Sequence, residues 1–269
     1  MQTGNNLNGK RKSIFVTGAT NGTGYAIADR FASEGYTVFI GSRDKKAAET
    51  AAQNLNKKRG VPTHGYGTKI FDEKNVREIF ADIRDQGYLL DTLVLNAANL
   101  AIGQVSLDVN MADFMQVFET NIGWNFMLAR EAAKQMREKG KGSIVFISSN
   151  SALRVTEDRC AYCASKSAIL AMSKSFAVDW GKYGIRSNCV LAGMIKTQRW
   201  EDNLNNIKQC LANYTPIGDI ADFTDIADAV WYFGNDCSKN TTGAELVVDG
   251  GMLAQLVPNI SRGLFKNES

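Results

Sequence analysis

The chain has a single histidine and three prolines among its 269 residues, and it has no long apolar run. His64 stands apart from the only C-x-x-C, Cys160 to Cys163, so zinc ligands are scarce and no metal site is expected. The few prolines argue against a hinge between domains. No stretch approaches the ~18 apolar residues of a membrane span, and the polar start lacks the apolar core of a signal peptide. These absences predict a protein with no metal and no membrane segment.

The five cysteines are an odd number in a chain large enough to form a core, so a disulfide framework is not expected. Cys160 and Cys163 are predicted instead to be small buried residues beside Tyr162. This cysteine usage favours a reduced, cytoplasmic setting. The formal net charge of +3, from 31 basic and 28 acidic side chains, is too even to indicate nucleic-acid binding.

Segments rich in strand-forming residues alternate along the chain with segments of helical periodicity. Strands separated by helices imply right-handed crossovers, which predicts one α/β domain with a doubly wound parallel sheet of about seven strands. That domain is expected over residues 13–252, between a polar tail at 1–12 and a second tail at 253–269. The expected strands are 13–17, 36–40, 63–70, 91–96, 143–148, 185–191 and 244–248, and the expected helices are 25–33, 45–58, 73–84, 114–138 with a break near Gly123, 159–181 and 225–233.

Glycines 18, 22 and 24 form a G-x-x-x-G-x-G pattern in the segment Thr17–Gly24. The first glycine lets a strand turn sharply, and the others let the backbone approach a pyrophosphate at the positive end of a helix. Such a pattern is weak alone, but the apolar strand before it and the helix after it make it strong. The segment predicts a dinucleotide site in a Rossmann-type sheet.

Cofactor choice is usually read at the end of the second strand, where an NAD site places a carboxylate for the ribose hydroxyls. This chain has Ser42 and Arg43 there, followed by Asp44. Arg43 can pair with a 2′-phosphate through charge-assisted hydrogen bonds, which favours NADP(H) over NAD(H). The alternative is that Arg43 is a solvated loop residue and that Asp44 holds the ribose.

Tyr162 and Lys166 stand four residues apart in a predicted helix, so their side chains share one face, and Ser149 lies thirteen residues upstream of the tyrosine. Lowering a phenol pKa from ~10 to ~7 takes about 4 kcal/mol. A lysine charge ~5 Å away supplies about 3 kcal/mol at an effective dielectric of ~20. Together with a dinucleotide site, this pair predicts a carbonyl/alcohol oxidoreductase.

From Ser13 to about Met252 the chain resembles the short-chain dehydrogenase/reductase family. The matching pieces are modest singly but highly specific together. They are Thr17–Gly24, Asn96-Ala97-Ala98, Asn121, Ser149, Tyr162 with Lys166, Ile185-Arg186-Ser187-Asn188 and Val248-Asp249-Gly250-Gly251.

The resemblance implies roles for these residues. Tyr162 would be the general acid in reduction and the base in oxidation, while Lys166 would hold the nicotinamide ribose and lower the pKa of the tyrosine. Ser149 would bind and polarise the substrate oxygen, and Asn121 would fix a water that completes a proton relay. The residues expected at the cofactor are Gly18, Thr20, Asn21, Gly22, Thr23, Gly24, Ser42, Arg43, Ile70, Asn96, Ala97, Tyr162, Lys166, Gly193, Ile195 and Thr197.

The sequence departs from the family pattern beside the cofactor. Ala98 replaces a glycine, Ala192 replaces a proline, and Lys69 stands where an aspartate near the adenine is expected. No basic residue directly precedes Gly22, where many NADP-preferring members carry one. These differences concern cofactor contacts and leave the catalytic set intact.

The predicted reaction is NADP(H)-dependent interconversion of a secondary alcohol and a ketone by hydride transfer. Apolar residues in the segment 194–214 suit a lid over a bulky ring system, and the run 159–169 resembles bacterial hydroxysteroid (bile acid) dehydrogenases. A steroid or similar hydrophobic alcohol is therefore favoured, while a 3-oxoacyl-thioester reductase and a sugar-alcohol dehydrogenase stay open. An alternative of another class is a catalytically idle protein that senses NADP(H). Such a sensor would need no proton relay, so the presence of Ser149, Tyr162, Lys166 and Asn121 argues against it. The resemblance also suggests a homotetramer or homodimer.

Overall fold

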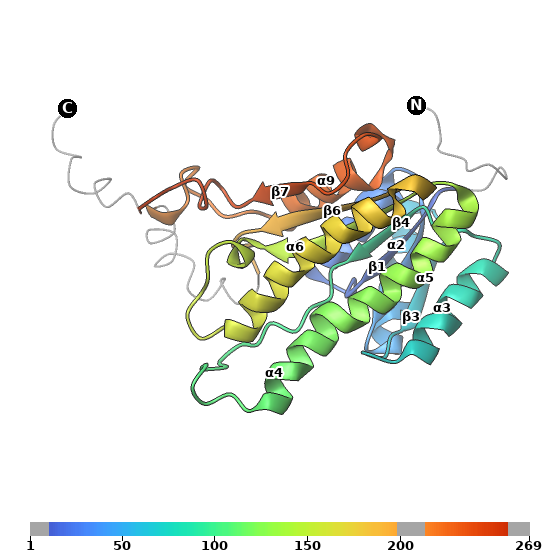
Figure 1. Ribbon diagram of the computed structural model, residues 1–269. Coiled ribbons are helices and arrows are strands. Elements are labelled where there is room, and N and C mark those ends of the chain that lie inside the picture. Colours follow the sequence, from blue (N-terminus) through green and yellow to red (C-terminus); the bar gives the residue numbers. More distant parts are fainter. Residues whose placement is uncertain (1–10, 198–212, 258–269) are drawn as a thin grey trace, which may run out of the picture.

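The computed structural model describes residues 11–197 and 213–257, and its centre is one parallel sheet of seven strands (Figure 1). The strands lie in the order β3-β2-β1-β4-β5-β6-β7. The chain adds β2 and β3 on one side of β1 and β4 to β7 on the other, so the strand order switches between β1 and β4. This is a doubly wound Rossmann-type sheet, and the predicted fold class is confirmed. The strands are β1 (Ser13–Thr17), β2 (Thr37–Ser42), β3 (Thr63–Gly67), β4 (Thr92–Leu95), β5 (Gly142–Ser149), β6 (Ile185–Ala192) and β7 (Glu245–Val248).

Helices cover both faces of the sheet (Figure 1). One face packs against α1, α2 and α9, and the other against α3, α5 and α6. The helices are α1 (Gly22–Ser33), α2 (Lys45–Arg59), α3 (Glu73–Asp85), α4 (Met111–Phe118), α5 (Asn125–Lys139), α6 (Cys160–Trp180) and α9 (Phe223–Gly234).

The central strands are buried on both faces because successive side chains point to opposite sides of the sheet. In β5, Val145 and Ile147 pack toward α1 and α9, whereas Ile144 and Phe146 pack toward α5 and α6. All four side chains are nearly inaccessible to solvent. This two-sided burial explains why these strands read as continuous apolar runs.

The predicted break near Gly123 is a change of helix type. Between α4 and α5 the chain forms a π-helical segment, Glu119–Trp124, so residues 111–139 stay helical throughout. The absence of a side chain on Gly123 matters here, because a Cβ at this position would lie 2.3 Å from Cε2 of Phe71. The helix α1 also begins at Gly22, earlier than the predicted residue 25.

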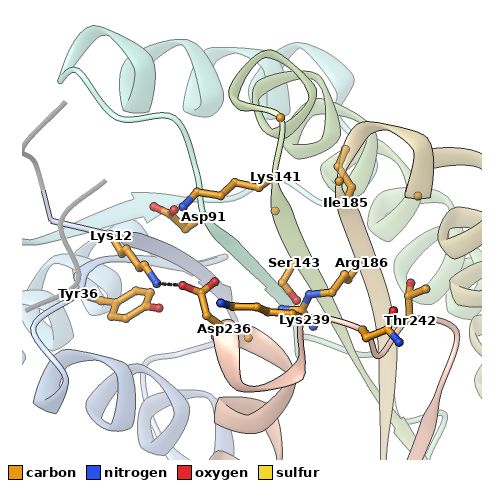
Figure 2. A pocket seen from close by; sticks show the side chains of 16 residues that line it. Lys12, Tyr36, Asp91, Lys141, Ser143, Ile185, Arg186, Asp236, Lys239 and Thr242 are labelled. Carbon is orange, nitrogen blue, oxygen red and sulfur yellow. Dashed lines mark hydrogen bonds and ion pairs between the residues drawn. The ribbon is translucent and has the colours of Figure 1, made fainter. Parts of the chain in front are cut away.

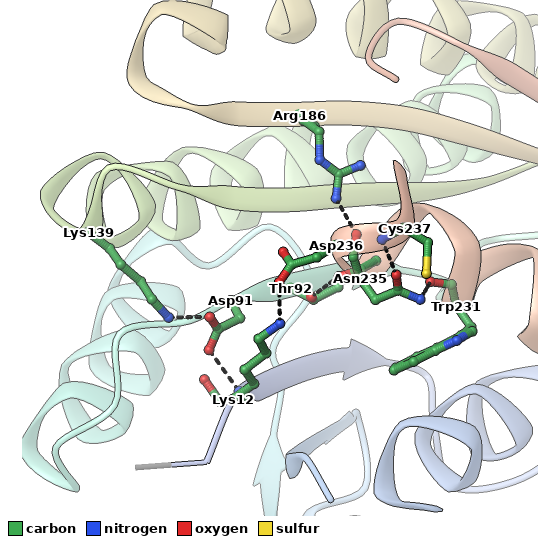
Figure 3. A network of polar contacts seen from close by, with 11 residues as sticks. Lys12, Asp91, Thr92, Lys139, Arg186, Trp231, Asn235, Asp236 and Cys237 are labelled. Atoms are coloured by element: carbon green, nitrogen blue, oxygen red, sulfur yellow. Dashed lines mark hydrogen bonds and ion pairs between the residues drawn. The ribbon is translucent and has the colours of Figure 1, made fainter. Parts of the chain in front are cut away.

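Two ion pairs lie at the amino end of the sheet. Lys12 Nζ lies 2.7 Å from Asp236 Oδ2, and the aspartate is 60% exposed (Figure 2). Lys139 at the end of α5 pairs with Asp91 at the start of β4, with side chains only 4% and 9% exposed (Figure 3). Asp91 also accepts a hydrogen bond of 2.9 Å from the backbone N–H of Ser13. The buried pair therefore joins α5, β4 and β1.

Parts of the expected lid and tails fall outside the described residues, including Trp200, Leu204, Ile207 and Leu211. The division into residues 13–252 and two tails stays a prediction. Among the described residues, no helix is both long and apolar enough to cross a membrane. The same residues contain no cluster of three or more histidine, cysteine or acidic side chains that could hold a metal.

We expect the two ion pairs to differ sharply in their contribution to stability. Asp91→Ala leaves the buried Lys139 uncompensated and should lower the free energy of unfolding by about 3–5 kcal/mol. Asp236→Ala breaks a more exposed pair and should cost at most ~1 kcal/mol. Urea denaturation of both variants measures the two losses of unfolding free energy, and equal losses would contradict a larger contribution from the buried pair.

Candidate active site

The glycine loop forms the turn from β1 into α1. Gly18 has a φ of +63°, in the left-handed region that favours glycine, and its N–H donates to Gly41 O at 2.8 Å. A Cβ on Gly24 would lie 2.2 Å from Gly18 O, so a side chain at position 24 would clash with backbone. Around Gly22, by contrast, the nearest atom to a Cβ would be the Phe223 ring at 3.5 Å. Position 24 is thus tightly packed, whereas the backbone at Gly22 has free space beside it, and both features fit a pyrophosphate site.

Asn96 holds the end of β4 against this loop. Its Nδ2 donates to Thr17 O at 3.0 Å and to Gly18 O at 3.1 Å. In return, Thr17 Oγ1 accepts from the N–H groups of Asn96 and Ala97, at 3.0 Å and 3.1 Å. The carboxyl ends of β1 and β4 are therefore fixed relative to each other where a cofactor of this fold would lie.

Tyr162 and Lys166 lie on the first turns of α6, with Lys166 Nζ 5.5 Å from the centre of the tyrosine ring. Both side chains are buried, at 8% and 3% exposure. Lys166 Nζ donates to Ile147 O at 2.7 Å, which ties α6 to β5. Ser149, at the end of β5, is near enough to the phenol of Tyr162 to lower its pKa. The structure thus brings together the three residues that the sequence pattern singled out.

Burial dominates the ionisation of this pair. It lowers the pKa of Lys166 to about 8, because the charged ammonium loses its hydration. Burial also raises the pKa of Tyr162, while the hydrogen bond with Ser149 and the charge of Arg159 act in the opposite direction. The resemblance assigned this lowering effect to Lys166. In the structure Arg159 is a second cation beside the phenol, while the Lys166 ammonium also donates to a backbone carbonyl.

Asn121 lies in the π-helical segment and is fully buried. Its Oδ1 accepts from the N–H of Asn99 at 2.8 Å, and its Nδ2 donates to Asn99 O at 3.0 Å and to Ser165 Oγ at 2.9 Å. Ser165 Oγ in turn donates to Tyr162 O at 2.8 Å. Asn121 therefore connects the loop after β4 to the helix that carries the tyrosine.

The residues predicted to discriminate between cofactors follow the end of β2. Arg43 is exposed, and it lines one groove together with Lys45 and Lys69. Asp44 is the N-cap of α2, where its Oδ1 accepts from Ala47 N at 3.1 Å. The carboxylate of Asp44 is thus engaged by the helix that follows.

The remaining expected cofactor residues follow the carboxyl ends of other strands. Gly193, directly after β6, has no room for a side chain because a Cβ would lie 2.5 Å from Asp249 Cβ. Ile195 forms a bridge with Ala221, and Ile70 packs at the edge of the core beside α3. Thr20 lies in the glycine loop, Thr23 lies in the first turn of α1, and Thr197 is the last residue of the described range 11–197.

Arg159 is the residue that the motifs did not reveal. Its guanidinium carbon lies 4.2 Å from the centre of the Tyr162 ring. Its Nε and Nη2 donate to Leu100 O at 3.1 Å and 2.6 Å, so it also holds the loop after β4. The only available signal was an arginine three residues before the tyrosine. Cys163 is buried as predicted, but Cys160 is exposed, so that prediction was wrong for Cys160.

A family model described as enoyl-(acyl carrier protein) reductase matches residues 18–253. The chain therefore belongs to the short-chain dehydrogenase/reductase family, whose members act on CH–OH groups. It is 34% identical over 259 residues to the NADP-dependent (R)-specific alcohol dehydrogenase of Lentilactobacillus kefiri, with 91% of this chain and 98% of that protein covered.

The chain is also similar to hydroxysteroid dehydrogenases. It is 29% identical over 246 residues to the 7alpha-hydroxysteroid dehydrogenase of Clostridium sardiniense, covering 89% of this chain and 92% of that protein. A solved 7α-hydroxysteroid dehydrogenase, complexed with NADH and 7-oxo glycochenodeoxycholic acid, superposes with a TM-score of 0.82. That structure is 28% identical and is matched over 89% of this chain and 93% of its own.

Loss of the Arg159 charge should disfavour the ionised form of Tyr162. For Arg159→Gln we expect the rise of alcohol oxidation with pH to move to higher pH, with a severalfold lower rate at neutral pH. The pH profile of kcat/KM for a secondary alcohol measures this shift. Arg154→Gln, at an exposed arginine nearby in the chain, is the matched control. An unchanged profile for Arg159→Gln would contradict the role of its charge.

Proposed function

We propose that Tyr162 is the general acid and base of this oxidoreductase. In carbonyl reduction its hydroxyl gives a proton to the substrate oxygen as that oxygen gains negative charge, and in alcohol oxidation the phenolate takes the proton back. The support is that the phenol is buried, lies near Ser149 at the end of β5 and has the cations of Arg159 and Lys166 beside its ring. When bound, a nicotinamide cofactor supplies or accepts the hydride.

Ser149, Lys166 and Asn121 have supporting roles in this proposal. The Ser149 hydroxyl lies at the carboxyl end of β5 and also accepts from Ser151 N at 3.1 Å, which fixes its position for binding the substrate oxygen. Lys166 would hold the nicotinamide ribose, and its ammonium would return a proton to the Tyr162 phenolate. Asn121 keeps the loop after β4 at a fixed distance from α6.

Tyr162→Phe removes the proton donor and keeps the ring. We expect at least a hundredfold loss of kcat, in the range of ~10²–10⁴ that general acid–base catalysis contributes. Cofactor affinity should stay close to that of the wild type. Tyr183→Phe, at a tyrosine beyond the end of α6, is the matched control. Activity within about tenfold of the wild type, ~1.4 kcal/mol in barrier, would refute the role of Tyr162.

We propose further that the enzyme prefers NADP(H). Arg43 directly follows β2, and its exposed guanidinium can meet a 2′-phosphate there. The alternative ribose ligand, Asp44, has its carboxylate engaged in the cap of α2. The relative from Lentilactobacillus kefiri is described as NADP-dependent, whereas the solved hydroxysteroid dehydrogenase contains NADH.

Arg43→Ala tests this preference. We expect the affinity for NADPH to fall at least tenfold, about 1.4 kcal/mol, with little change for NADH. Titration of the intrinsic fluorescence with each cofactor measures both constants. Lys57→Ala, at the exposed far end of α2, controls for a general loss of positive charge. Equal weakening of NADPH and NADH would rule out a specific contact with the phosphate.

For the substrate we propose a steroid or a similarly hydrophobic secondary alcohol. Large apolar side chains are exposed in the loops that leave the carboxyl ends of β4 and β5, which would suit an apolar ring system better than a sugar. They are Leu100, Ile102, Val105 and Leu107 after β4, and Leu153 and Val155 after β5.

A panel of substrates decides between this proposal and its alternatives. NADPH oxidation is followed with steroid ketones, 3-oxoacyl thioesters and keto-sugars, and we expect the fastest turnover with a steroid ketone. Turnover of one of the other classes would reassign the substrate. Cofactor binding without turnover of any class would favour the sensor. The homotetramer or homodimer and the cytoplasmic location stay predictions.

A further inference from the structure

A second cavity opens at the amino end of the sheet (Figure 2), opposite the carboxyl end of β5 that carries Ser149. We call it the amino-end basin. Its walls come from the start of β1, the α5–β5 turn, the start of β6 and the segment after α9, so segments far apart in sequence build it. The side chains that argue for a ligand are Lys12, Asp91, Lys141, Arg186, Asp236 and Lys239.

Positive charge exceeds negative charge in the amino-end basin. Its lining carries four basic side chains and two aspartates. Asp91 is paired with Lys139, which does not line the basin, and Asp236 is paired with Lys12. Across the described part of the chain, Lys141 and Lys239 have no ion-pair partner within 4.0 Å. Five basic groups therefore surround two acidic ones.

Among the described residues, the Arg186 guanidinium forms hydrogen bonds with neutral groups only. Its Nη1 donates to Ser238 Oγ at 2.6 Å and its Nη2 to Asn235 O at 2.9 Å (Figure 3). These bonds fix the guanidinium in place but do not neutralise it. Arg186 is partly buried, and burial lowers its pKa while the charge of Asp236 raises it.

The charges of the basin lie close enough to influence one another. Burial lowers the pKa of Lys139 and its pairing with Asp91 raises it, while the charges of Lys141 and Lys12 add a smaller lowering effect. The hydrogen bond from Lys12 lowers the pKa of Asp236, helped by the charges of Lys141 and Lys239. Figure 2 shows Lys12 and Lys239 both directed toward Asp236. An anion placed among these side chains would relieve the repulsion between like charges.

We propose that the amino-end basin binds a small oxyanion with two or more negative charges, of the phosphate or polycarboxylate class. Lysine ammonium groups bind such anions as point charges. The glycine N–H groups nearby are already used, since Gly142 N donates to Gly184 O and Gly184 N to Gly181 O. Recognition is therefore by charge, so affinity rises with the charge of the anion and falls with salt.

Calorimetric titration with inorganic phosphate, at constant ionic strength, tests this site in the whole protein. We expect saturable binding and a Tm that rises with phosphate concentration, as for any ligand of the folded state. Pyrophosphate should bind more tightly than phosphate, and acetate should not bind. Absence of phosphate binding, or equal binding of acetate, would overturn the proposal.

Variants separate the basin from the cofactor loop, which also suits phosphate. Lys141→Gln/Lys239→Gln should weaken phosphate binding at least tenfold, and because neither lysine forms an ion pair, folding should be kept. The matched control is Lys57→Gln/Lys74→Gln, an equal charge change outside the basin. Arg43→Ala should leave phosphate binding unchanged. Binding that survives the basin variant, or is lost only in Arg43→Ala, would place the anion elsewhere and overturn the proposal.

Discussion

The arrangement of the carboxyl edge of the sheet depends on the hydrogen bonds of the Asn96 side chain. A carboxamide that donates to two carbonyls of the neighbouring strand end leaves no freedom for the turn that follows β1. The helix α1 then starts so close to Gly18 that position 24 has no room for a side chain. The geometry of the dinucleotide loop is thus set as much by β4 as by the glycines themselves.

In the half of the site that contains Tyr162, the buried Lys166 fixes the position of α6. Lys166 is almost inaccessible to water, yet its ammonium bonds to a strand carbonyl of β5. That bond orients α6, and with it the phenol one turn earlier, relative to Ser149. The energetic cost is a desolvated charge, visible in the lowered pKa of the lysine.

Much of this could be predicted from local pattern. The bounds of β1 were predicted to the residue because Ile14, Phe15 and Val16 favour a strand and the glycine loop begins directly after Thr17. Tyr162, Lys166 and Ser149 were found because their spacing is fixed by one helix and one strand. The contact between Arg159 and Leu100 was not predictable, since it depends on how two loops meet. Exposure of Cys160 was missed for a similar reason, because the first helical turn borders solvent on one side.

The π-helical segment between α4 and α5 has a consequence for sequence change. A π turn holds one residue more than an α turn, and each added residue rotates the rest of a helix by about 100°. The wide turn therefore lets α4, whose Val117 packs in one cluster with Tyr162, take a different rotational setting from α5, which is packed onto the sheet. Asn121 sits inside this turn and is anchored on both sides. The face that α4 presents can thus change while the phase of α5 stays constant, and a shortened variant that lost one residue here would couple the two again.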